Sequence, residues 1–369
     1  MKKIIIFSKS FWNTYNFRID LILTLVEKKY KIIVVANNDN YRPKFKNLNI
    51  NTYSISVKNR KFSPLNDIWY LFKTYNILKK EKPDIVLNFN LKPIIYSNII
   101  CRIFKIKTIS NITGLGSAFL GSSLLKFIVS KLYRYSFKKN NHIFFQNRED
   151  QNYFLTRGII DHKNEISIIP GSGVNTKKFP YSEIENKENI IFFMASRLIK
   201  DKGVLEFIEA AKIITSKYKN IEFILLGDKE NSYESSKIYE IVKSYHTKKI
   251  LSYYNFKENI YDYLYKSDCV ILPSYREGLS KILIESMSIG RPVITTNVPG
   301  CKELVRENGF LVSPRNINDL VNKIEQFIKL DFSIRRKMCI NSRRIVDKNY
   351  KIEIIIQKYL NIIEKKIYE

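Results

Sequence analysis

The sequence predicts an α/β protein built from two doubly wound domains, each with a parallel sheet. Short β-branched or aromatic runs alternate with segments of helical periodicity along the whole chain. The strand-like runs are continuously apolar, which is typical of parallel strands that helices cover on both faces. The alternation stops once, at a segment rich in glycine and proline, and then starts again. A length of 369 residues is sufficient for two domains.

The first half contains seven expected strands, with helical periodicity in several of the gaps between them. Examples of this periodicity are Arg18–Lys28 and Ile68–Lys79. The expected strands are Lys3–Phe7, Lys31–Ala36, Tyr53–Val57, Asp84–Phe89, Lys107–Asn111, His142–Gln146 and Ile166–Ile169.

The domain boundary is expected in "IIPGSGVNTKKFP", which has two glycines and two prolines within eleven residues. We therefore predict Rossmann-like domains at residues 1–174 and 175–351. The second half contains expected strands at Ile190–Ala195, Ile221–Leu226, Lys249–Ser252, Cys269–Leu272, Pro292–Thr296 and Phe310–Val312. Its expected helices are Val204–Lys217, Ser280–Ile289, Asn318–Leu330 and Ile352–Ile367.

Composition excludes several classes of protein. Lys and Arg number 63 against 35 Asp and Glu, a formal net charge of +28. No run of about 18 apolar residues is present, so we expect no membrane span. The apolar run in "MKKIIIFSKSFW" is too short for a signal peptide. The four cysteines are far apart, as in a reduced cytosolic protein. The chain has no D-x-D pair and no cluster of His and Cys, so we expect no metal and no cofactor.

Two glutamates stand out in "SYREGLSKILIESMSIGRPVITT". Glu277 is expected in the loop after the strand "CVIL", and Glu285 about one and a half turns into the next helix. A rise of about 1.5 Å per residue separates Glu285 from the helix start by several ångströms. In doubly wound sheets, ligands bind at the carboxyl ends of the strands. The two acids are therefore placed to contact two depths of one ligand in a cleft between the domains.

The same loop offers a phosphate site. Gly278 allows close backbone approach, and we expect free N–H groups on Gly278, Leu279 and Ser280 at the helix start. A phosphate flanked by two hydroxyl-bearing groups matches the order of a sugar, a diphosphate and a ribose. The alternative is a solvated Glu277 on a surface loop and a Glu285 paired along its helix.

Two cations follow the strand Ile190–Ala195 in "MASRLIKDKGVLEF". Arg197 can bind phosphate through two nitrogens, and Lys202 adds a point charge. Without a metal, these cations and the helix start could neutralise a diphosphate leaving group. The alternative is two solvated surface cations, as is usual for Lys and Arg.

These motifs resemble a known family. "SRLIKDKG", "LLGD", "LPSYREGLSKILIESMSIGRPVITTNVPGCKELV" and "NGFLV", in this order, are similar to the GT-B retaining glycosyltransferases of family four. The first half, with "YNFR", "NITGLGSAF" and "HIFFQNRED", resembles bacterial enzymes that extend glycans on a polyprenyl-diphosphate carrier, as in capsule and O-antigen synthesis.

The resemblance implies transfer of a sugar, with an N-acetylhexosamine expected, from a UDP-linked donor to a lipid-linked saccharide. Arg197 and Lys202 would hold the diphosphate, Glu285 the ribose, and Glu277 the donor sugar. Transfer would retain the anomeric configuration without a metal. Further donor contacts are expected at Gly278, Leu279, Ser280, Asn255 and Phe256, and acceptor contacts at Asn16, Arg18, Thr113 and Gly114.

The chain departs from the family pattern in its first domain, where "NITGLG" has no histidine and the first loop, "SKSFWNTYNFR", has no glycine. The resemblance also implies that the last helix, 352–367, packs back on the first domain. Residues 123–139 combine apolar and basic residues, as in an amphipathic helix on an anionic membrane surface, or equally in a helix with one core-facing side. With a lipid-linked acceptor, we expect a cytoplasmic protein on the inner face of the plasma membrane.

Two other classes of function are weighed against this one. The positive charge suits a non-catalytic protein that binds membrane or nucleic acid. However, the cations are dispersed and no nucleic-acid-binding motif is present, so we expect no nucleic-acid partner. A nucleotide-sugar epimerase of the same fold is the third interpretation, and an epimerised free sugar nucleotide would favour it.

Overall fold

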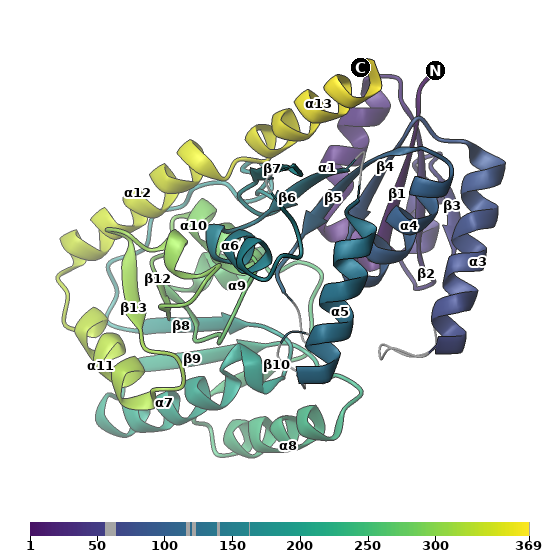
Figure 1. Cartoon of the computed structure of the whole chain (residues 1–369). Helices are drawn as coiled ribbons and strands as arrows, with labels where there is room; N and C mark the ends of the chain where they lie inside the picture. The colour runs from purple at the N-terminus through teal and green to yellow at the C-terminus, as the bar shows by residue number, and fades with distance from the viewer. Residues whose placement is uncertain (56–63, 116–118, 120–122, 139–140, 162, 369) are drawn as a thin grey trace. The chain divides into compact units, whose positions relative to one another are not determined.

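The computed structural model describes residues 1–55, 64–115, 119, 123–138, 141–161 and 163–368. Their packing divides the chain into two compact units (Figure 1). One contains Met1–Ser172 and Glu353–Glu369, and the other contains Gly173–Ile352. The sequence places the boundary two residues later, after Val174.

The first unit is built on a parallel sheet of seven strands in the described part of the chain, in the order β3-β2-β1-β4-β5-β6-β7. Almost every residue of the central strands is buried, which accounts for their continuous apolar runs. The strands are β1 (Lys3–Ser10), β2 (Lys31–Asn37), β3 (Asn51–Ser54), β4 (Ile85–Phe89), β5 (Lys107–Ile112), β6 (Asn141–Phe145) and β7 (Glu165–Ile168).

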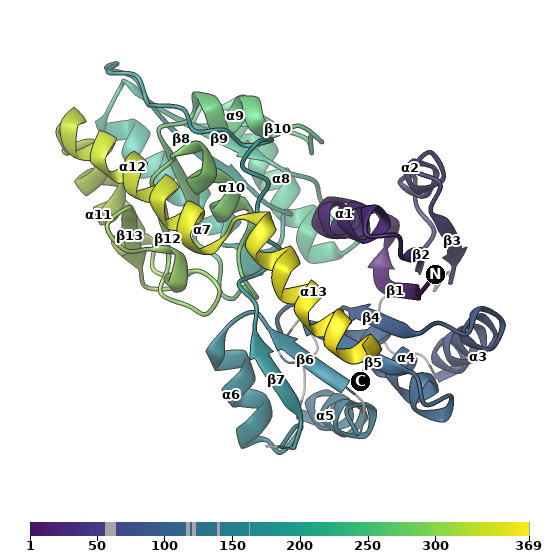
Figure 2. The ribbon, with the colours of Figure 1, turned by 90° about the horizontal axis from the view of Figure 1, so that it is seen from above.

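Helices cover both faces of this sheet, as Figure 2 shows. On one face lie α3 (Pro64–Glu81), α4 (Leu91–Ile103) and α5 (Ser123–Ser136), with α4 packed between the other two. On the other face lie α1 (Phe11–Glu27) and α13 (Ile352–Tyr368). The unit is completed by α2 (Arg42–Lys46) and α6 (Arg148–Thr156).

One tyrosine fixes α13 to the first sheet. The Tyr359 side chain is buried, and its hydroxyl accepts a hydrogen bond of 2.5 Å from Nδ2 of Asn111 on β5. Its ring centroid lies 6.1 Å from that of Phe89 and 5.0 Å from that of Phe144. On the same face, the Arg18 guanidinium of α1 lies 4.4 Å from the Phe89 centroid. The last helix is thus part of the core of the first unit.

The second unit has a parallel sheet of six strands in the part that the structure describes, in the order β10-β9-β8-β11-β12-β13. The strands are β8 (Ile190–Ala195), β9 (Ile221–Leu226), β10 (Ser252–Tyr254), β11 (Cys269–Leu272), β12 (Val293–Thr296) and β13 (Gly309–Val312). The helices are α7 (Val204–Lys217), α8 (Tyr233–Thr247), α9 (Tyr261–Lys266), α10 (Lys281–Ile289), α11 (Ile317–Ile328) and α12 (Phe332–Asn349), with 3-10 turns η2 (Lys200–Lys202) and η3 (Lys302–Leu304).

Several elements differ from the prediction, and helices α8, α9 and α12 of the second unit were not among the expected helices. Helix α1 begins at Phe11, because the Ser10 side chain caps it by accepting from the Asn13 N–H. Strand β10 starts later than expected, because Lys249 adopts a left-handed φ of 58° in the turn that closes α8. Helix α12 was not predicted, because its buried stripe is thin and includes the small polar Ser342.

Part of the predicted third strand, Ser56 and Val57, lies outside the described residues. Within the described ranges, no helix is both long and apolar enough to cross a bilayer.

We predict that Tyr359→Phe lowers the free energy of unfolding by about 1–3 kcal/mol, because the buried Asn111 amide loses its acceptor. The midpoint of urea denaturation measures this change. Tyr368→Phe is the matched control, since Tyr368 on the same helix is 76% exposed. Equal midpoints for both variants would show that this hydrogen bond contributes nothing to stability.

Candidate active site

Two loops of the second unit meet at the carboxyl ends of the adjacent strands β8 and β11. The Tyr275 N–H donates to the Asp201 carbonyl over 2.8 Å, and the Ser274 hydroxyl donates to the same oxygen over 3.0 Å. Gly203 has a φ of 72°, and a Cβ there would lie 2.1 Å from the Pro273 carbonyl oxygen. Backbone packing therefore fixes the Lys202 loop against the Glu277 loop.

Lys202 and Glu277 form an ion pair across these two loops. Both side chains are largely buried, at 19% and 13% exposed, so solvent screens the pair less than it would on an open surface. From the sequence, Lys202 was expected at the diphosphate of a ligand and Glu277 at its sugar. The structure instead brings their charged ends together, which is contact information that spacing along the chain does not contain.

The loop after β12 holds the Glu277 loop through backbone hydrogen bonds. The Glu277 N–H donates to the Pro299 carbonyl over 3.1 Å. The Ser280 N–H donates to the Gly300 carbonyl over 3.0 Å, so the expectation of a free donor at Ser280 was wrong. Gly300 has a φ of 79°, and an added Cβ would lie 2.5 Å from the Glu277 carbonyl oxygen. Only glycine fits this approach without displacing the loop.

Glu285 lies on α10, which begins after the N-cap residue Ser280. Its side chain is buried, and its Oε1 lies 3.3 Å from Nζ of Lys281 on the same helix. Burial raises the pKa of Glu285, and the nearby ammonium opposes this shift only in part. Pairing along the helix was the alternative that the sequence left open, and this contact is present.

Arg197 follows β8 and is about half exposed. Its Nη1 lies 2.5 Å from Oε1 of Glu230, which comes from the loop after β9. After β10, the Asn255 side chain accepts from the Tyr253 hydroxyl over 2.8 Å, and the Phe256 N–H donates to Asp228 Oδ1 over 3.0 Å. All of these residues therefore lie at one edge of the sheet.

Further contacts that hold the Glu277 loop come from residues that the sequence did not indicate as part of the site. The Tyr275 hydroxyl donates to Oε1 of the buried Glu206 over 2.5 Å, and the Arg315 guanidinium lies 4.6 Å from the Tyr275 centroid. Burial and the Glu206 carboxylate raise the pKa of Tyr275, so the tyrosine stays a neutral donor. Tyr275 directly follows the strand, as Glu277 does, but nothing in the sequence identifies Glu206 as its partner.

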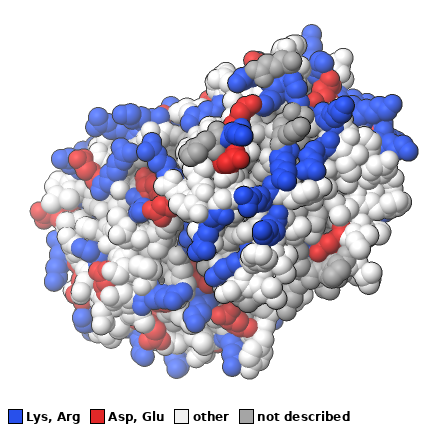
Figure 3. Space-filling view, in the orientation of Figure 1, with Lys and Arg blue, Asp and Glu red and all other residues white. Residues whose placement is uncertain are grey.

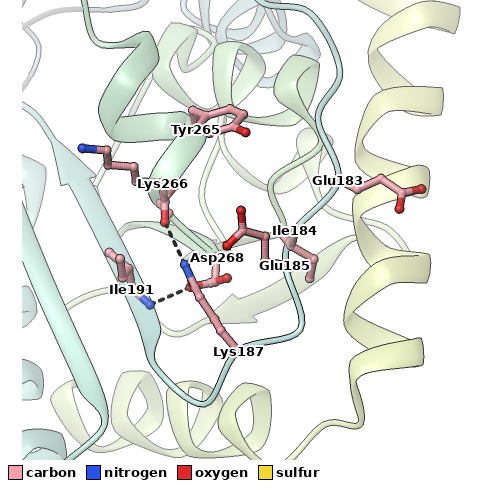
Figure 4. A pocket seen from close by; sticks show the side chains of 9 residues that line it. Glu183, Ile184, Glu185, Lys187, Ile191, Tyr265, Lys266 and Asp268 are labelled. Atoms are coloured by element: carbon pink, nitrogen blue, oxygen red, sulfur yellow. Dashed lines mark hydrogen bonds and ion pairs between the residues drawn. The ribbon is translucent and has the colours of Figure 1, made fainter.

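A pocket at the opposite edge of this sheet contains none of the predicted site residues (Figure 4). Asp268, just before β11, accepts from the Ile191 N–H over 2.8 Å, and Lys187 Nζ lies 3.5 Å from its carboxylate. Burial raises the pKa of Asp268. The carboxylate thus joins β8 and β11 at their amino ends. Among the described residues, no cluster of His, Cys, Asp and Glu could hold a metal ion.

The predicted acceptor residues lie in the first unit. Thr113 and Gly114 directly follow β5, and the Thr113 hydroxyl accepts from Asn90 Nδ2 over 3.4 Å. The Asn16 amide donates to the Trp12 carbonyl on α1. Arg18 is buried against the sheet and donates to the Phe17 carbonyl. Its contact with an acceptor stays a prediction. Residues 116–118 of the "NITGLGSAF" motif lie outside the described residues.

Comparison with known proteins agrees with this geometry. Residues 175–345 match the family "Glycosyl transferases group 1", and residues 3–147 match "Glycosyl transferase 4-like". Each match falls within one unit. The two matches together span most of the chain, and with the two parallel sheets they place it among the glycosyltransferases of the GT-B fold.

Curated relatives extend over most of the chain. A Campylobacter jejuni N,N'-diacetylbacillosaminyl-diphospho-undecaprenol alpha-1,3-N-acetylgalactosaminyltransferase is 26% identical over 96% of each chain. An Escherichia coli UDP-Gal:alpha-D-GlcNAc-diphosphoundecaprenol alpha-1,3-galactosyltransferase is 27% identical over 83% of each chain. Among solved structures, the UDP-glucose complex of Anabaena Alr3699/HepE has a TM-score of 0.80, with 16% identity over 99% of this chain and 100% of that one.

We predict that Gly300→Ala displaces the Glu277 loop and lowers the free energy of unfolding by about 1–3 kcal/mol or more, through backbone strain and the contact with the Glu277 carbonyl. Thermal denaturation measures the loss. Gly158→Ala is the control, because Gly158 has a φ of 59° but its Cβ would meet nothing nearer than Arg134 Nη2 at 3.9 Å. If both variants lose the same stability, the close approach at Gly300 is unimportant.

Proposed function

We propose that this glycosyltransferase moves a sugar from a UDP-linked donor to a saccharide on a polyprenyl diphosphate, with retention of anomeric configuration and without a metal. The observation that carries this proposal is the Lys202–Glu277 pair at the carboxyl edge of the second sheet, with Arg197 nearby. The names of the Campylobacter and Escherichia relatives supply the acceptor class, and the first of them favours an N-acetylhexosamine donor.

In this mechanism the second unit binds the donor. Arg197 and Lys202 attract the diphosphate and stabilise the negative charge that develops as the sugar leaves. Glu285 accepts hydrogen bonds from the ribose hydroxyls. Glu277 accepts from a hydroxyl of the donor sugar while it holds the Lys202 ammonium in place.

The transfer itself breaks one bond and forms one. The acceptor hydroxyl oxygen bonds to the anomeric carbon as the bond from that carbon to the diphosphate oxygen breaks, on the same face of the sugar. The hydroxyl proton passes to the departing diphosphate oxygen. No side chain is a nucleophile in this scheme, so Glu277 is a residue that positions the sugar.

The first test is calorimetric titration of the purified protein with UDP, GDP, ADP and CMP, without added metal. We expect selective binding of UDP. Arg197→Ala should weaken that binding by about 1.5–3 kcal/mol, because a charge-assisted hydrogen bond to phosphate is lost.

Arg336→Ala is the matched control, since Arg336 is equally exposed and pairs with Glu183 as Arg197 pairs with Glu230. An unchanged UDP affinity in Arg197→Ala would remove this arginine from the site. Absence of binding by any of the nucleotides would overturn the proposed donor.

We predict that Glu277→Gln reduces turnover by about 100-fold or more while UDP affinity changes little, because a neutral amide stabilises Lys202 and the sugar less well than a carboxylate does. The assay is transfer of labelled sugar into a lipid-extractable product. Glu183→Gln, at an exposed ion pair with Arg336, is the control. Full activity of the Glu277 variant would end this assignment.

A further inference from the structure

Helix α3 presents an apolar stripe to solvent. Leu65, Ile68, Trp69 and Phe72 are 82%, 63%, 39% and 60% exposed. Their spacing of three, four and seven residues places them on one face of the helix. The opposite face supplies Tyr70, Ile77 and Leu78 to the core. An exposed run of this size is unusual on a monomeric protein and typically marks an interaction surface.

Helix α5 presents a second such stripe. Leu124, Phe127, Ile128 and Tyr135 are 69%, 61%, 44% and 46% exposed, while its other face packs into the core. The core-facing side that one of the two sequence interpretations expected is present, and the outer side is apolar as well as basic.

The topology brings the two stripes to one side of the first unit. Both helices lie on the same face of the sheet, and each packs against α4, which lies between them. Each helix follows a strand of a parallel sheet, so each begins at the carboxyl edge. The stripe on α3 and most of the stripe on α5 lie in the first turns, and they therefore lie at the same edge.

Cations surround these apolar side chains. Lys73 Nζ lies 5.4 Å from the Trp69 ring centroid, and Lys131 Nζ lies 5.3 Å from that of Phe127. Arg102 of α4 lies over the Tyr135 ring and donates to its hydroxyl over 2.9 Å. The sequence of α5 contains no Asp or Glu. On the face drawn in Figure 3, blue Lys and Arg outnumber red Asp and Glu.

We propose that the exposed stripes of α3 and α5 form one surface that docks on an anionic lipid bilayer. Apolar side chains enter the acyl boundary, and the cations beside them reach the phosphates of the headgroups. Trp69 and Tyr135 have the amphipathic rings that favour this interface. A nucleic acid would match the charge but would leave Leu65, Ile68 and Phe72 in water.

This surface has a consequence for the acceptor, which rests on the proposed function. Thr113 and Gly114 end β5 at the same carboxyl edge from which α3 and α5 begin. A bilayer touching the two helix starts therefore places the headgroups beside the predicted acceptor residues. A saccharide on a polyprenyl diphosphate would reach these residues while its polyprenyl chain stays in the membrane.

The experiment is co-sedimentation of the full chain with vesicles, without nucleotide or acceptor. Vesicles of phosphatidylglycerol and phosphatidylcholine in equal parts should bind the protein, and vesicles of phosphatidylcholine alone should bind it much less. Phe72→Ser with Phe127→Ser should weaken vesicle binding at least about tenfold, because two aromatic side chains that enter the acyl boundary of the bilayer are lost. Lys73→Glu with Lys131→Glu should weaken it and reduce its dependence on salt.

Matched controls lie in the second unit. Ile340→Ser removes an isoleucine that is 48% exposed on α12, and Lys237→Glu removes a cation that lies 4.5 Å from the exposed Tyr233 ring. Neither should change vesicle binding. All substituted side chains are exposed, so thermal midpoints should stay at the wild-type value.

If the Phe72→Ser/Phe127→Ser variant binds vesicles as strongly as the wild type does, the assignment of this surface is overturned. The assignment is also overturned if the wild-type protein does not bind vesicles but forms dimers in analytical ultracentrifugation, and if the same substitutions abolish those dimers. Nucleotide titration of each variant separates this inference from the proposed function. A chain that binds vesicles but no nucleotide would retain the docking surface and lose the proposed donor.

Discussion

Parallel strand pairing is the constraint on which the rest of this structure depends. A parallel strand cannot be joined to its neighbour by a tight turn, so every connection must cross over the sheet and return to the other edge. All segments that follow strands are therefore gathered at one edge of each sheet. The loops after β8, β9, β10, β11 and β12 meet there in the second unit, although their residues are far apart in the chain. In the first unit the same constraint aligns the starts of α3 and α5.

The candidate site pairs its charges although the chain as a whole is strongly basic. Lys202 contacts Glu277, Arg197 contacts Glu230, and Lys281 contacts Glu285. Unpaired cations at such a site would repel one another, and the acids relieve this repulsion. Under the proposed function, a diphosphate therefore meets cations that carboxylates already hold in place.

Much of the fold was predictable because its signals are local. Strands β8, β9 and β11 and helix α7 have the predicted bounds, since apolar runs and helical periodicity depend on neighbouring residues. The errors have physical causes of two kinds. Lys249 adopts a left-handed backbone conformation that no side-chain pattern predicts. Helix α12 has only a narrow buried stripe, and most of its other residues are polar or basic. The site was predictable only as positions at strand ends. The ion pairs of the site depend on contacts between segments that are far apart in the sequence. The burial of Arg18 in the core depends on such contacts as well.

The contact between Tyr359 and the first sheet also sets an order of folding. The second unit has its whole sequence once residue 352 has been synthesised, whereas the first unit lacks part of its core until α13 follows. Until then Phe89 and Phe144, which pack against Tyr359, lie on a sheet face without their covering helix. Domains usually mature from the N-terminus during synthesis. Here the unit that is made first is completed last, when α13 joins α1 on that face.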